Sequence, residues 1–344
     1  MHAQNKISVL VVDDSLVFRE VISRGIETDP NIRVVAKAGD PFEARDYILK
    51  YQPDLMICDI QMPKMNGIEF IRRLLPQYSL PVLIVSSANN VVFDALNAGA
   101  VDFVGKPNAN SPEDVKNFIM DLIQKIKMAV CVNVRKDHSC EVQVINEMQS
   151  VPMEKKIIAV GASTGGTEAI LQLLQSLPTN IPGMVVVQHI PPVFSGMFAQ
   201  RLEQTTPFRV KEAQTGDFVE QGKVLIASGD KHMRVKKVGS KFKVDCFEGE
   251  KVSGHCPSVD VLFHSVAKEI GKYAVGVILT GMGNDGAKGL LAMRRRGART
   301  IGQHEASSVV YGMPKVAYNV GAVEKQASLS RIPQLLYSMA MEKI

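Results

Sequence analysis

Tryptophan is absent from the 344 residues, and cysteine, with five, is scarce and odd in number. No two cysteines stand in CxxC spacing, which argues against a disulfide framework and against a cysteine zinc site. Long hydrophobic runs are also missing: AVGVIL and MVVV fall far short of the roughly 20 residues that a membrane span needs. The amino-terminal segment lacks a long apolar region and a cleavage site. We therefore expect a cytoplasmic protein with neither a signal peptide nor membrane insertion.

The sequence also lacks a strong excess of either charge, because 40 Lys and Arg face 35 Asp and Glu. The balance is uneven along the chain: residues 1–127 carry 14 basic and 16 acidic side chains, net −2, whereas residues 128–344 carry 26 and 19, net +7. Basic residues are dispersed, apart from Arg294–Arg296, which we interpret as a solvated helix end, and aromatic residues are few. We expect no nucleic acid as a partner, and an acidic partner for the carboxy-terminal part.

Glycine is missing between Lys106 and Val160, so the middle of the chain is not a flexible Gly/Ser tether. A length of 344 residues favours two domains. On both sides of this segment, short apolar runs alternate with amphipathic stretches, as in doubly wound parallel α/β sheets. We predict one such domain over residues 1–127 and another over residues 155–344, joined by a linker at 128–154.

Apolar runs locate the strands of both predicted sheets. Ser111, Pro112 and Asp114 predict the start of the last helix of the first domain, as N-cap, first-turn proline and capping box. Turn signals between residues 223 and 249 favour β-hairpins added to the second domain. The predicted strands cover residues 7–14, 32–39, 54–60, 81–88 and 101–107 in the first domain and 156–163, 183–190 and 273–281 in the second.

Polar side chains follow the strands of the first domain at the point where each strand ends. They are Asp13, Asp14, Asp59, Ser86 and Lys106. Because the carboxyl ends of parallel strands meet at one edge, where ligands bind, we expect these side chains to lie together. Carboxylates that are held together repel unless a cation joins them, and all-oxygen ligands favour Mg²⁺. A phosphoryl group fits beside such an ion.

The motifs VVDDS, CDIQMPKMNG, VSSA and GKP resemble the receiver domain of two-component response regulators, a flavodoxin-like fold of five parallel strands. The resemblance implies that Asp59 accepts phosphate from a histidine kinase. It also implies that Asp13, Asp14, Asp59 and the Gln61 carbonyl hold Mg²⁺, that Ser86 bonds the phosphoryl oxygen, and that Lys106 neutralises the phosphoryl charge. Phe103 stands where receivers keep an aromatic switch residue, and it is equally well explained as a core phenylalanine.

In the second domain, a serine stands between glycines where an apolar strand gives way to a helix. Gly161, Ser163 and Gly165 match the GxSxG pattern that exposes a nucleophilic hydroxyl. A phosphate cradle at a helix N-terminus is the alternative for the same glycines. A dinucleotide site fits less well, since GASTGG is not GxGxxG and no acidic residue ends the following strand.

A nucleophilic serine needs a base and a carboxylate that orients it. His189 follows the next apolar strand, and Asp285 lies in a glycine-rich loop after a third strand, so that three strand ends deliver Ser, His and Asp in that order. An α/β-hydrolase has the order Ser, Asp, His instead. The glycines around Asp285 also let backbone N–H groups turn toward an oxyanion.

The motifs VGASTGGTEA, QHIPPVF, PSVDVLFHSVA, GVILTGMGNDGAKGL and EASSVVYGMP are similar to the catalytic domain of the CheB family of chemotaxis protein-glutamate methylesterases. The resemblance implies a Rossmann-like catalytic domain, a triad of Ser163, His189 and Asp285, and an oxyanion donor at the Met282 backbone N–H. Cys256 departs from the basic residue that many relatives have before PSVD.

The expected protein is thus a phosphorylation-regulated bacterial serine hydrolase. The resemblance implies that it demethylates γ-glutamyl methyl esters on chemoreceptors, and often deamidates glutamines, with Mg²⁺ for phosphorylation and no cofactor for hydrolysis. Alternatives are a receiver with a DNA-binding output, which would predict a short helix-turn-helix, and a nucleotide-binding oxidoreductase. We further expect the unphosphorylated receiver to cover the mouth near Ser163 and phospho-Asp59 to loosen this contact.

Overall fold

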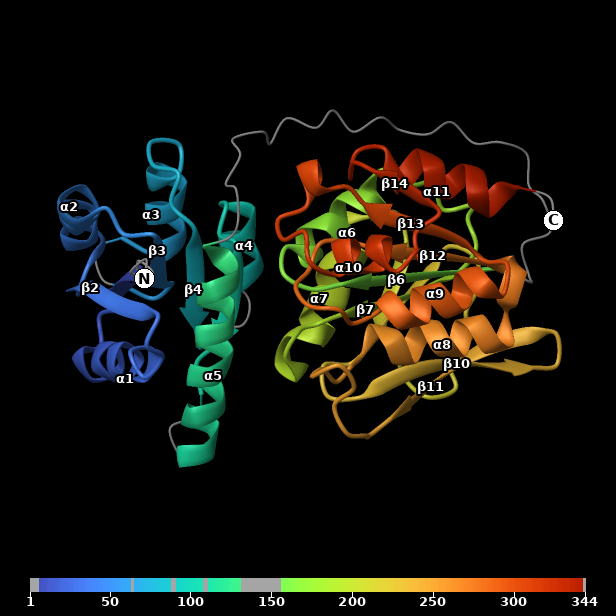
Figure 1. The fold of residues 1–344 in the computed structure, drawn as a ribbon, viewed down its shortest axis with the longest axis horizontal. Helices are drawn as coiled ribbons and strands as arrows, with labels where there is room; N and C mark the ends of the chain where they lie inside the picture. Colours follow the sequence, from blue (N-terminus) through green and yellow to red (C-terminus); the bar gives the residue numbers. More distant parts are fainter. Residues whose placement is uncertain (1–5, 63–64, 88–90, 108–110, 131–155, 343–344) are drawn as a thin grey trace. The chain divides into compact units, whose positions relative to one another are not determined.

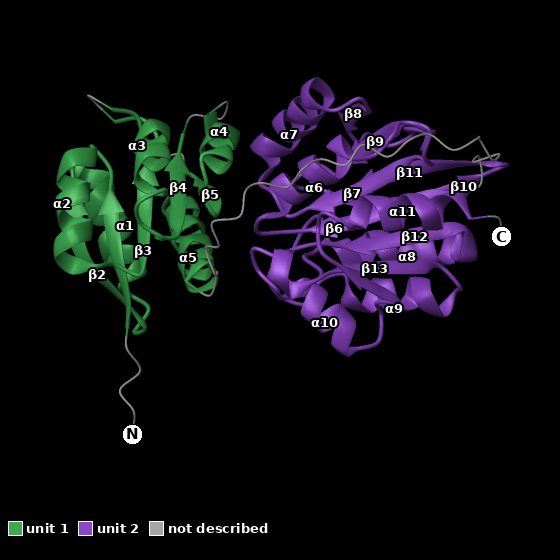
Figure 2. Cartoon of the chain, turned by 90° about the horizontal axis from the view of Figure 1, so that it is seen from above, with its two compact units in different colours: residues 1–137 green, residues 138–344 purple. Residues whose placement is uncertain are grey.

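The protein forms two compact units, residues 1–137 and 138–344 (Figure 2). A computed structural model describes residues 6–62, 65–87, 91–107, 111–130 and 156–342. Most of the expected linker lies outside these residues, and so do Cys131 and Cys140. Helix α5 of the first unit continues to Ala129, two residues beyond the expected domain end, and the domain boundaries stay a prediction.

The first unit is a five-stranded parallel sheet with strand order β2-β1-β3-β4-β5. Helices alternate with the strands along the chain (Figure 1). This order is the flavodoxin-like doubly wound topology, and the fold predicted from the apolar runs is confirmed. Its strands are β1 (Ile7–Val12), β2 (Ile32–Ala38), β3 (Leu55–Asp59), β4 (Val82–Ser86) and β5 (Asp102–Gly105), and its helices are α1 (Leu16–Ile26), α2 (Pro41–Tyr51), α3 (Gly67–Leu74), α4 (Val92–Asn97) and α5 (Pro112–Ala129).

Local sequence explains these elements. β3 and β4 are buried at every residue, which is the pattern of central strands covered by helices on both faces. α5 begins as predicted: the Ser111 side chain accepts a hydrogen bond from the Asp114 N–H at 3.4 Å, and Pro112 occupies the first turn. The face of α5 that carries Phe118, Leu122 and Ile126 is buried.

The second unit holds a seven-stranded parallel sheet with strand order β14-β13-β12-β6-β7-β9-β8. The chain starts at the central strand β6, extends the sheet through β7 to one side, and later extends it through β12 to the other. The point between β6 and β12 is therefore the topological switch, where ligands bind in open α/β sheets. The strands are β6 (Ile157–Ala162), β7 (Met184–Gln188), β8 (Arg209–Glu212), β9 (Lys223–Ile226), β12 (Ala274–Ile278), β13 (Arg299–Gln303) and β14 (Lys325–Ala327), and the helices are α6 (Gly166–Gln175), α7 (Pro192–Thr205), α8 (Val259–Glu269), α9 (Ala287–Arg295), α10 (Met313–Asn319) and α11 (Ile332–Met341).

A separate antiparallel hairpin, β10 (His232–Val238) and β11 (Lys241–Phe247), packs on α8 instead of joining the main sheet (Figure 1). It confirms the hairpin predicted between residues 223 and 249. The prediction is wrong for residues 223–226, because this run is the parallel strand β9.

Strands β8, β13 and β14 were not expected from the apolar runs. The edge strands β8 and β14 are short and partly polar, and they depend on a neighbouring strand for their hydrogen bonds. In β13 the buried residues Thr300 and Gln303 are polar, with side chains that bond the backbones of Ala322, Thr280 and Ser307. Among the described residues, no helix is both long and apolar enough to cross a membrane.

Candidate active site

The acidic edge of the first unit is assembled as the strand ends predict. Asp13 and Asp59 are buried, and the Nζ of Lys106 lies 2.8 Å from a carboxylate oxygen of each. Carboxylate oxygens of Asp13, Asp14 and Asp59 lie within 4.8 Å of one another. Burial raises the pKa of Asp59 above its ordinary value, while the hydrogen bond from Lys106 opposes this change. The carboxylates thus form an all-oxygen donor set whose charge the lysine partly balances.

Ser86 and Phe103 lie beside this edge on neighbouring strands. Ser86 is the buried last residue of β4, and its carbonyl accepts a hydrogen bond from the Lys106 N–H at 3.0 Å. The ring of Phe103 is also buried, 6.2 Å from that of Phe93, and Lys125 Nζ lies over it at 5.4 Å. Phe103 therefore has the environment of a core residue. Gln61, two residues after Asp59, is exposed.

In the second unit, Ser163 follows directly after β6, at the topological switch. It is half-buried, and Gly165, two residues later, is the N-cap of α6 with φ +74°. A side chain at Gly165 would be strained by this φ and would meet Val309, so glycine is required for the turn. This is the sharp strand-to-helix turn that the GxSxG pattern predicts.

His189 directly follows β7, where its N–H donates to the carbonyl of Ala162, the residue before Ser163, and Asp285 reaches His189 from the loop between β12 and α9. The Nε2 of His189 lies 2.9 Å from Oδ2 of Asp285, and both side chains are buried. The other ring nitrogen, Nδ1, is buried and has no hydrogen-bond partner among the described residues. With Nε2 bonded to the carboxylate, Nδ1 is the nitrogen left to take a proton from a nucleophile.

Asp285 is surrounded by donors from the start of α8. Its carboxylate accepts hydrogen bonds from the Ser258 hydroxyl at 2.8 Å and from the backbone N–H groups of Val259 and Asp260 at 2.8 and 3.0 Å. Burial alone would raise the pKa of Asp285, but the bond with His189 and these donors hold the pKa below its ordinary value. The carboxylate therefore stays charged and fixed in place, as an orienting acid must.

A second set of contacts ties the serine to the loop after β12. The Ser163 N–H donates to the Thr280 carbonyl at 3.0 Å, and a side chain at Gly281 would come within 2.7 Å of Ser163 Cβ. The next residue is Met282, whose side chain is exposed. This close approach brings the backbone of the loop against the serine, where an oxyanion donor is needed.

Three further residues of the site were missed by the sequence analysis. The Gln188 side-chain amide donates to the carbonyls of both Ser163 and His189, at 2.9 and 3.0 Å, and so links the two turns. Ser258 holds Asp285 as described, and the ring of His255 is stacked on that of His189. The sequence signal for Ser258 was its position as N-cap of an apolar helix in PSVDVLF.

Cys256 is half-buried, with its thiol directed to the Asp230 carbonyl at 3.4 Å.

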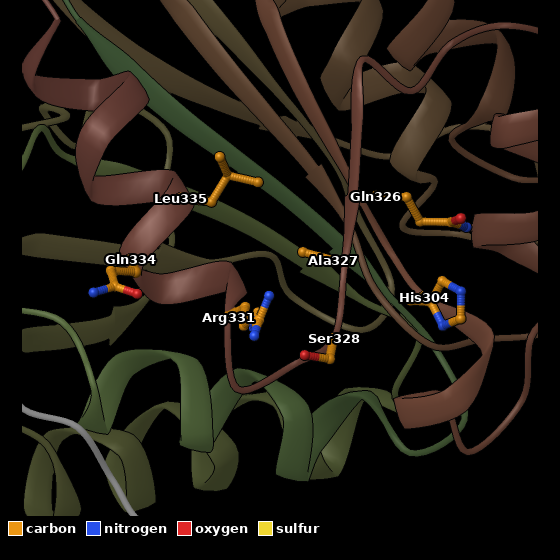
Figure 3. A pocket seen from close by; sticks show the side chains of 7 residues that line it. All are labelled: His304, Gln326, Ala327, Ser328, Arg331, Gln334 and Leu335. Carbon is orange, nitrogen blue, oxygen red and sulfur yellow. The ribbon is translucent and has the colours of Figure 1, made fainter.

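A cavity of about 610 Å³ lies elsewhere in this unit, at the ends of β13 and β14 and the start of α11. Figure 3 shows His304 and Gln326 across it from Gln334 and Leu335 of α11. None of Ser163, His189 and Asp285 lines it. This cavity is therefore not the place where Ser163, His189 and Asp285 are assembled.

Comparisons with known proteins agree with this arrangement. The CheB methylesterase family matches residues 158–336, and the response regulator receiver domain matches residues 9–117. A protein-glutamate methylesterase/protein-glutamine glutaminase 2 of Syntrophomonas wolfei is 55% identical over 97% of this chain and 98% of its own length. A protein-glutamate methylesterase/protein-glutamine glutaminase of Salmonella typhi is 43% identical over 96% of each chain.

The solved CheB methylesterase catalytic domain of Thermotoga maritima covers 54% of this chain and 98% of its own, with a TM-score of 0.52 and 36% identity. The relatives match 96–97% of the chain, receiver and catalytic parts together. Together with the fold and the position of Ser163, these matches show that the chain belongs to the CheB family of response regulator methylesterases.

Proposed function

We propose that this protein is a phosphorylation-regulated protein-glutamate methylesterase that hydrolyses γ-glutamyl methyl esters on bacterial chemoreceptors, deamidates receptor glutamines, and so serves adaptation in chemotaxis. The observation that carries this proposal is the 2.9 Å contact between His189 and Asp285, together with the Gln188 amide that bonds the carbonyls of both Ser163 and His189. The printed names of full-length relatives at 43–55% identity supply the reaction and the substrate class. We further propose a cytoplasmic location.

In the proposed mechanism, the Oγ of Ser163 attacks the γ-carbonyl carbon while Nδ1 of His189 takes the hydroxyl proton. The tetrahedral intermediate collapses to an acyl-enzyme as His189 returns this proton to the leaving methoxide or amide, which departs as methanol or ammonia. Water then attacks the acyl group, with His189 again as base, and releases the glutamate and the free serine. Asp285 keeps its charge and stabilises the imidazolium that forms twice in each cycle.

The backbone N–H of Met282 is the proposed oxyanion donor. Its support is the position of the loop, since Gly281 lies against Ser163 and permits no side chain there. A donor held by the rigid backbone needs no reorganisation when the charge develops, which makes such donors effective in catalysis.

The first unit is the proposed regulatory part, with residues 1–127 as receiver domain, 128–154 as linker and 155–344 as catalytic domain. Asp59 is the proposed phosphate acceptor, with a histidine kinase as donor. The all-oxygen cluster fits Mg²⁺, which would be held by Asp13, Asp14, Asp59 and the Gln61 carbonyl and would neutralise phosphoryl charge. Ser86 and Lys106 would bond the phosphoryl oxygens, and Phe103 would respond to the position of Ser86.

The test is the release of methanol from methylated chemoreceptor membranes by the purified chain. We expect release that depends on Ser163, and ammonia release from receptors with glutamine at the same sites. A wild-type protein that folds but produces neither product would overturn the proposed function.

A further inference from the structure

We propose that His255 is a positioning residue for catalysis, whose ring holds the imidazole of His189 in the plane that serves both Asp285 and Ser163. This inference rests on the proposed function, because it concerns the base of the same hydrolytic site. His255 is not one of the three proposed triad residues, and it lies on a different loop from each of them.

The two rings are arranged as a parallel stack. Their centroids lie 3.7 Å apart and their planes differ by 11°. Such a flat contact on one face opposes rotation of the His189 ring out of its plane. The only hydrogen bond of the ring among the described residues is the one from Nε2 to Asp285, since Nδ1 has no partner. One in-plane bond fixes a direction but not a ring plane, so the stack supplies the missing constraint.

The loop that carries His255 is built to hold it there. Val252 and His255 exchange two backbone hydrogen bonds of 3.0 Å, which close a two-residue turn. Ser253 and Gly254 in this turn have φ values of +53° and +84°. Left-handed backbone at both central positions defines the tight type I′ turn, which serine rarely enters. Non-glycine residues in this conformation persist only when the surrounding structure demands it, and they cluster at functional sites.

The same turn is attached to the element that holds Asp285. The Ser253 hydroxyl lies 3.4 Å from a carboxylate oxygen of Asp260, in the first turn of α8, and Asp260 and Ser258 bond Asp285. Residues 252–260 thus position both partners of the His189 ring: Asp285, which bonds its edge, and His255, which covers its face. Their mutual geometry is fixed before any substrate binds.

The charge state of His255 suits this role. Burial first, and then the neighbouring His189, lowers the pKa of His255 to about 4, with Lys251 acting in the same direction and Asp285 against it. At neutral pH the stacked ring is therefore uncharged. With so low a pKa, His255 is a poor base and competes little for the proton of Ser163. Its neutral ring also does not repel the imidazolium that His189 becomes, whereas a cation at this distance would disfavour that imidazolium.

The experiment compares His255→Ala with His255→Phe in the full chain, since phenylalanine keeps a flat ring and alanine removes it. A fluorophosphonate ester that labels activated serines reports the reactivity of Ser163 without any receptor, and p-nitrophenyl acetate gives kcat and KM. Val320→Ala, at an exposed position just after α10 and outside residues 252–260, is the matched control. Ser163→Ala is the blank for labelling, and thermal midpoints establish that each variant is folded.

We expect His255→Ala to lower both the labelling rate and kcat by about 10- to 100-fold with KM within about twofold, because a small misplacement of a catalytic group has effects of this size. His255→Phe should restore both to within about threefold of the wild type, and Val320→Ala should match the wild type.

Equal rates in His255→Ala and the wild type would overturn the inference. It would also fail if a folded His255→Phe were as slow as His255→Ala, because stacking would then not be the property that matters. A wild-type chain that is labelled no faster than Ser163→Ala would instead refute the serine hydrolase itself, so the two failures are distinct.

Discussion

At the scale of single residues, Asp285 receives more polar contacts than any other member of the proposed triad. Four donors, from His189, Ser258, Val259 and Asp260, converge on its two oxygens. Ser163, in contrast, forms hydrogen bonds to the described residues through its backbone alone, which leaves its hydroxyl available for attack. The site therefore combines a rigid acid with a free nucleophile, and replacement of each should have a different signature.

Replacement of the nucleophile removes the covalent step. Ser163→Ala should lower turnover by roughly 10³-fold or more while the thermal midpoint stays near that of the wild type, because the side chain is half-buried and small. Methanol release from methylated receptors, read beside a thermal melt, measures both quantities. Retention of a tenth of the wild-type rate would exclude Ser163 as nucleophile.

Replacement of the acid keeps the shape but changes the tautomer of the base. Asp285→Asn should lower kcat by about 10⁴-fold if this triad behaves as others do. In this variant the asparagine side-chain amide also replaces a carboxylate that accepts hydrogen bonds from the backbone N–H groups of Val259 and Asp260. A loss smaller than about tenfold would make Asp285 a structural turn residue, since the corresponding change in an orienting acid is far larger.

The lowered pKa of Asp285 also predicts how stability depends on pH. A carboxylate whose pKa is lower in the folded state stabilises the protein fully above its unfolded pKa, about 3.9, and loses this effect as the pH falls through the folded value. The difference in thermal midpoint between wild type and Asp285→Asn should thus be largest near neutral pH and shrink in the acid range. A difference that is constant or grows on acidification contradicts this assignment.

At the scale of elements, the start of α8 both stabilises the helix and holds the proposed catalytic acid in place. Ser258 accepts a hydrogen bond from the Val261 N–H at 3.4 Å as N-cap and donates one to Asp285 at 2.8 Å. His232, at the base of the β10–β11 hairpin, in turn accepts from the Ser258 N–H at 3.2 Å. The hairpin, the helix and the acid are therefore one connected unit.

Ser258→Ala should consequently weaken both functions of this helix start. We expect a loss of about 1 to 2 kcal/mol in the free energy of unfolding, from the N-cap and the buried hydrogen bond, together with a fall in kcat much smaller than that of Ser163→Ala. Ser258→Thr, which keeps a hydroxyl, is the matched variant and should recover most of both. Denaturant melts and methanol release give the two quantities. An unchanged kcat in Ser258→Ala would show that the Ser258 hydroxyl caps the helix but does not contribute to catalysis.

The elements that the sequence predicted and those that it did not differ in a physical way. β1, β3, β4 and β6 each contain an unbroken apolar run of four residues or more. The polar residue after such a run must lie at the carboxyl edge, so Asp13, Asp59 and Ser163 could be located from the pattern alone. The strand β14 has only three residues and no apolar run, and it forms because β13 offers an edge.

The contacts of His255 and Gln188 could not be predicted from the sequence pattern either. His255 reaches His189 through a tight turn whose conformation no periodicity encodes, and the two residues are far apart in the sequence. Gln188 ends an apolar strand, where a polar side chain can equally face solvent or the site. Proximity of this kind follows from loop geometry, which the sequence pattern constrains least.

At the scale of the whole molecule, a receiver and a hydrolase in one chain are useful together only if phosphorylation changes the hydrolytic rate. The net charges of −2 over residues 1–127 and +7 over residues 128–344 favour attraction between the two parts. A phosphoryl group on Asp59 would add negative charge at an edge where the Nζ of Lys106 lies 2.8 Å from the Asp59 carboxylate. Lys106 would be drawn toward this new charge, which gives the receiver a second local arrangement.

We therefore expect that a small-molecule phosphodonor with Mg²⁺ raises methanol release by the intact chain by roughly 5- to 150-fold, the range of ordinary allosteric coupling. Asp59→Asn should not respond. If the unphosphorylated receiver inhibits by covering the site, residues 155–344 alone should be faster than the unphosphorylated chain. If the fragment is no faster and only the phosphorylated chain gains, the receiver stimulates the catalytic part directly. If the fragment is no faster and the phosphodonor also changes nothing, the two parts are uncoupled, and regulation through Asp59 is excluded.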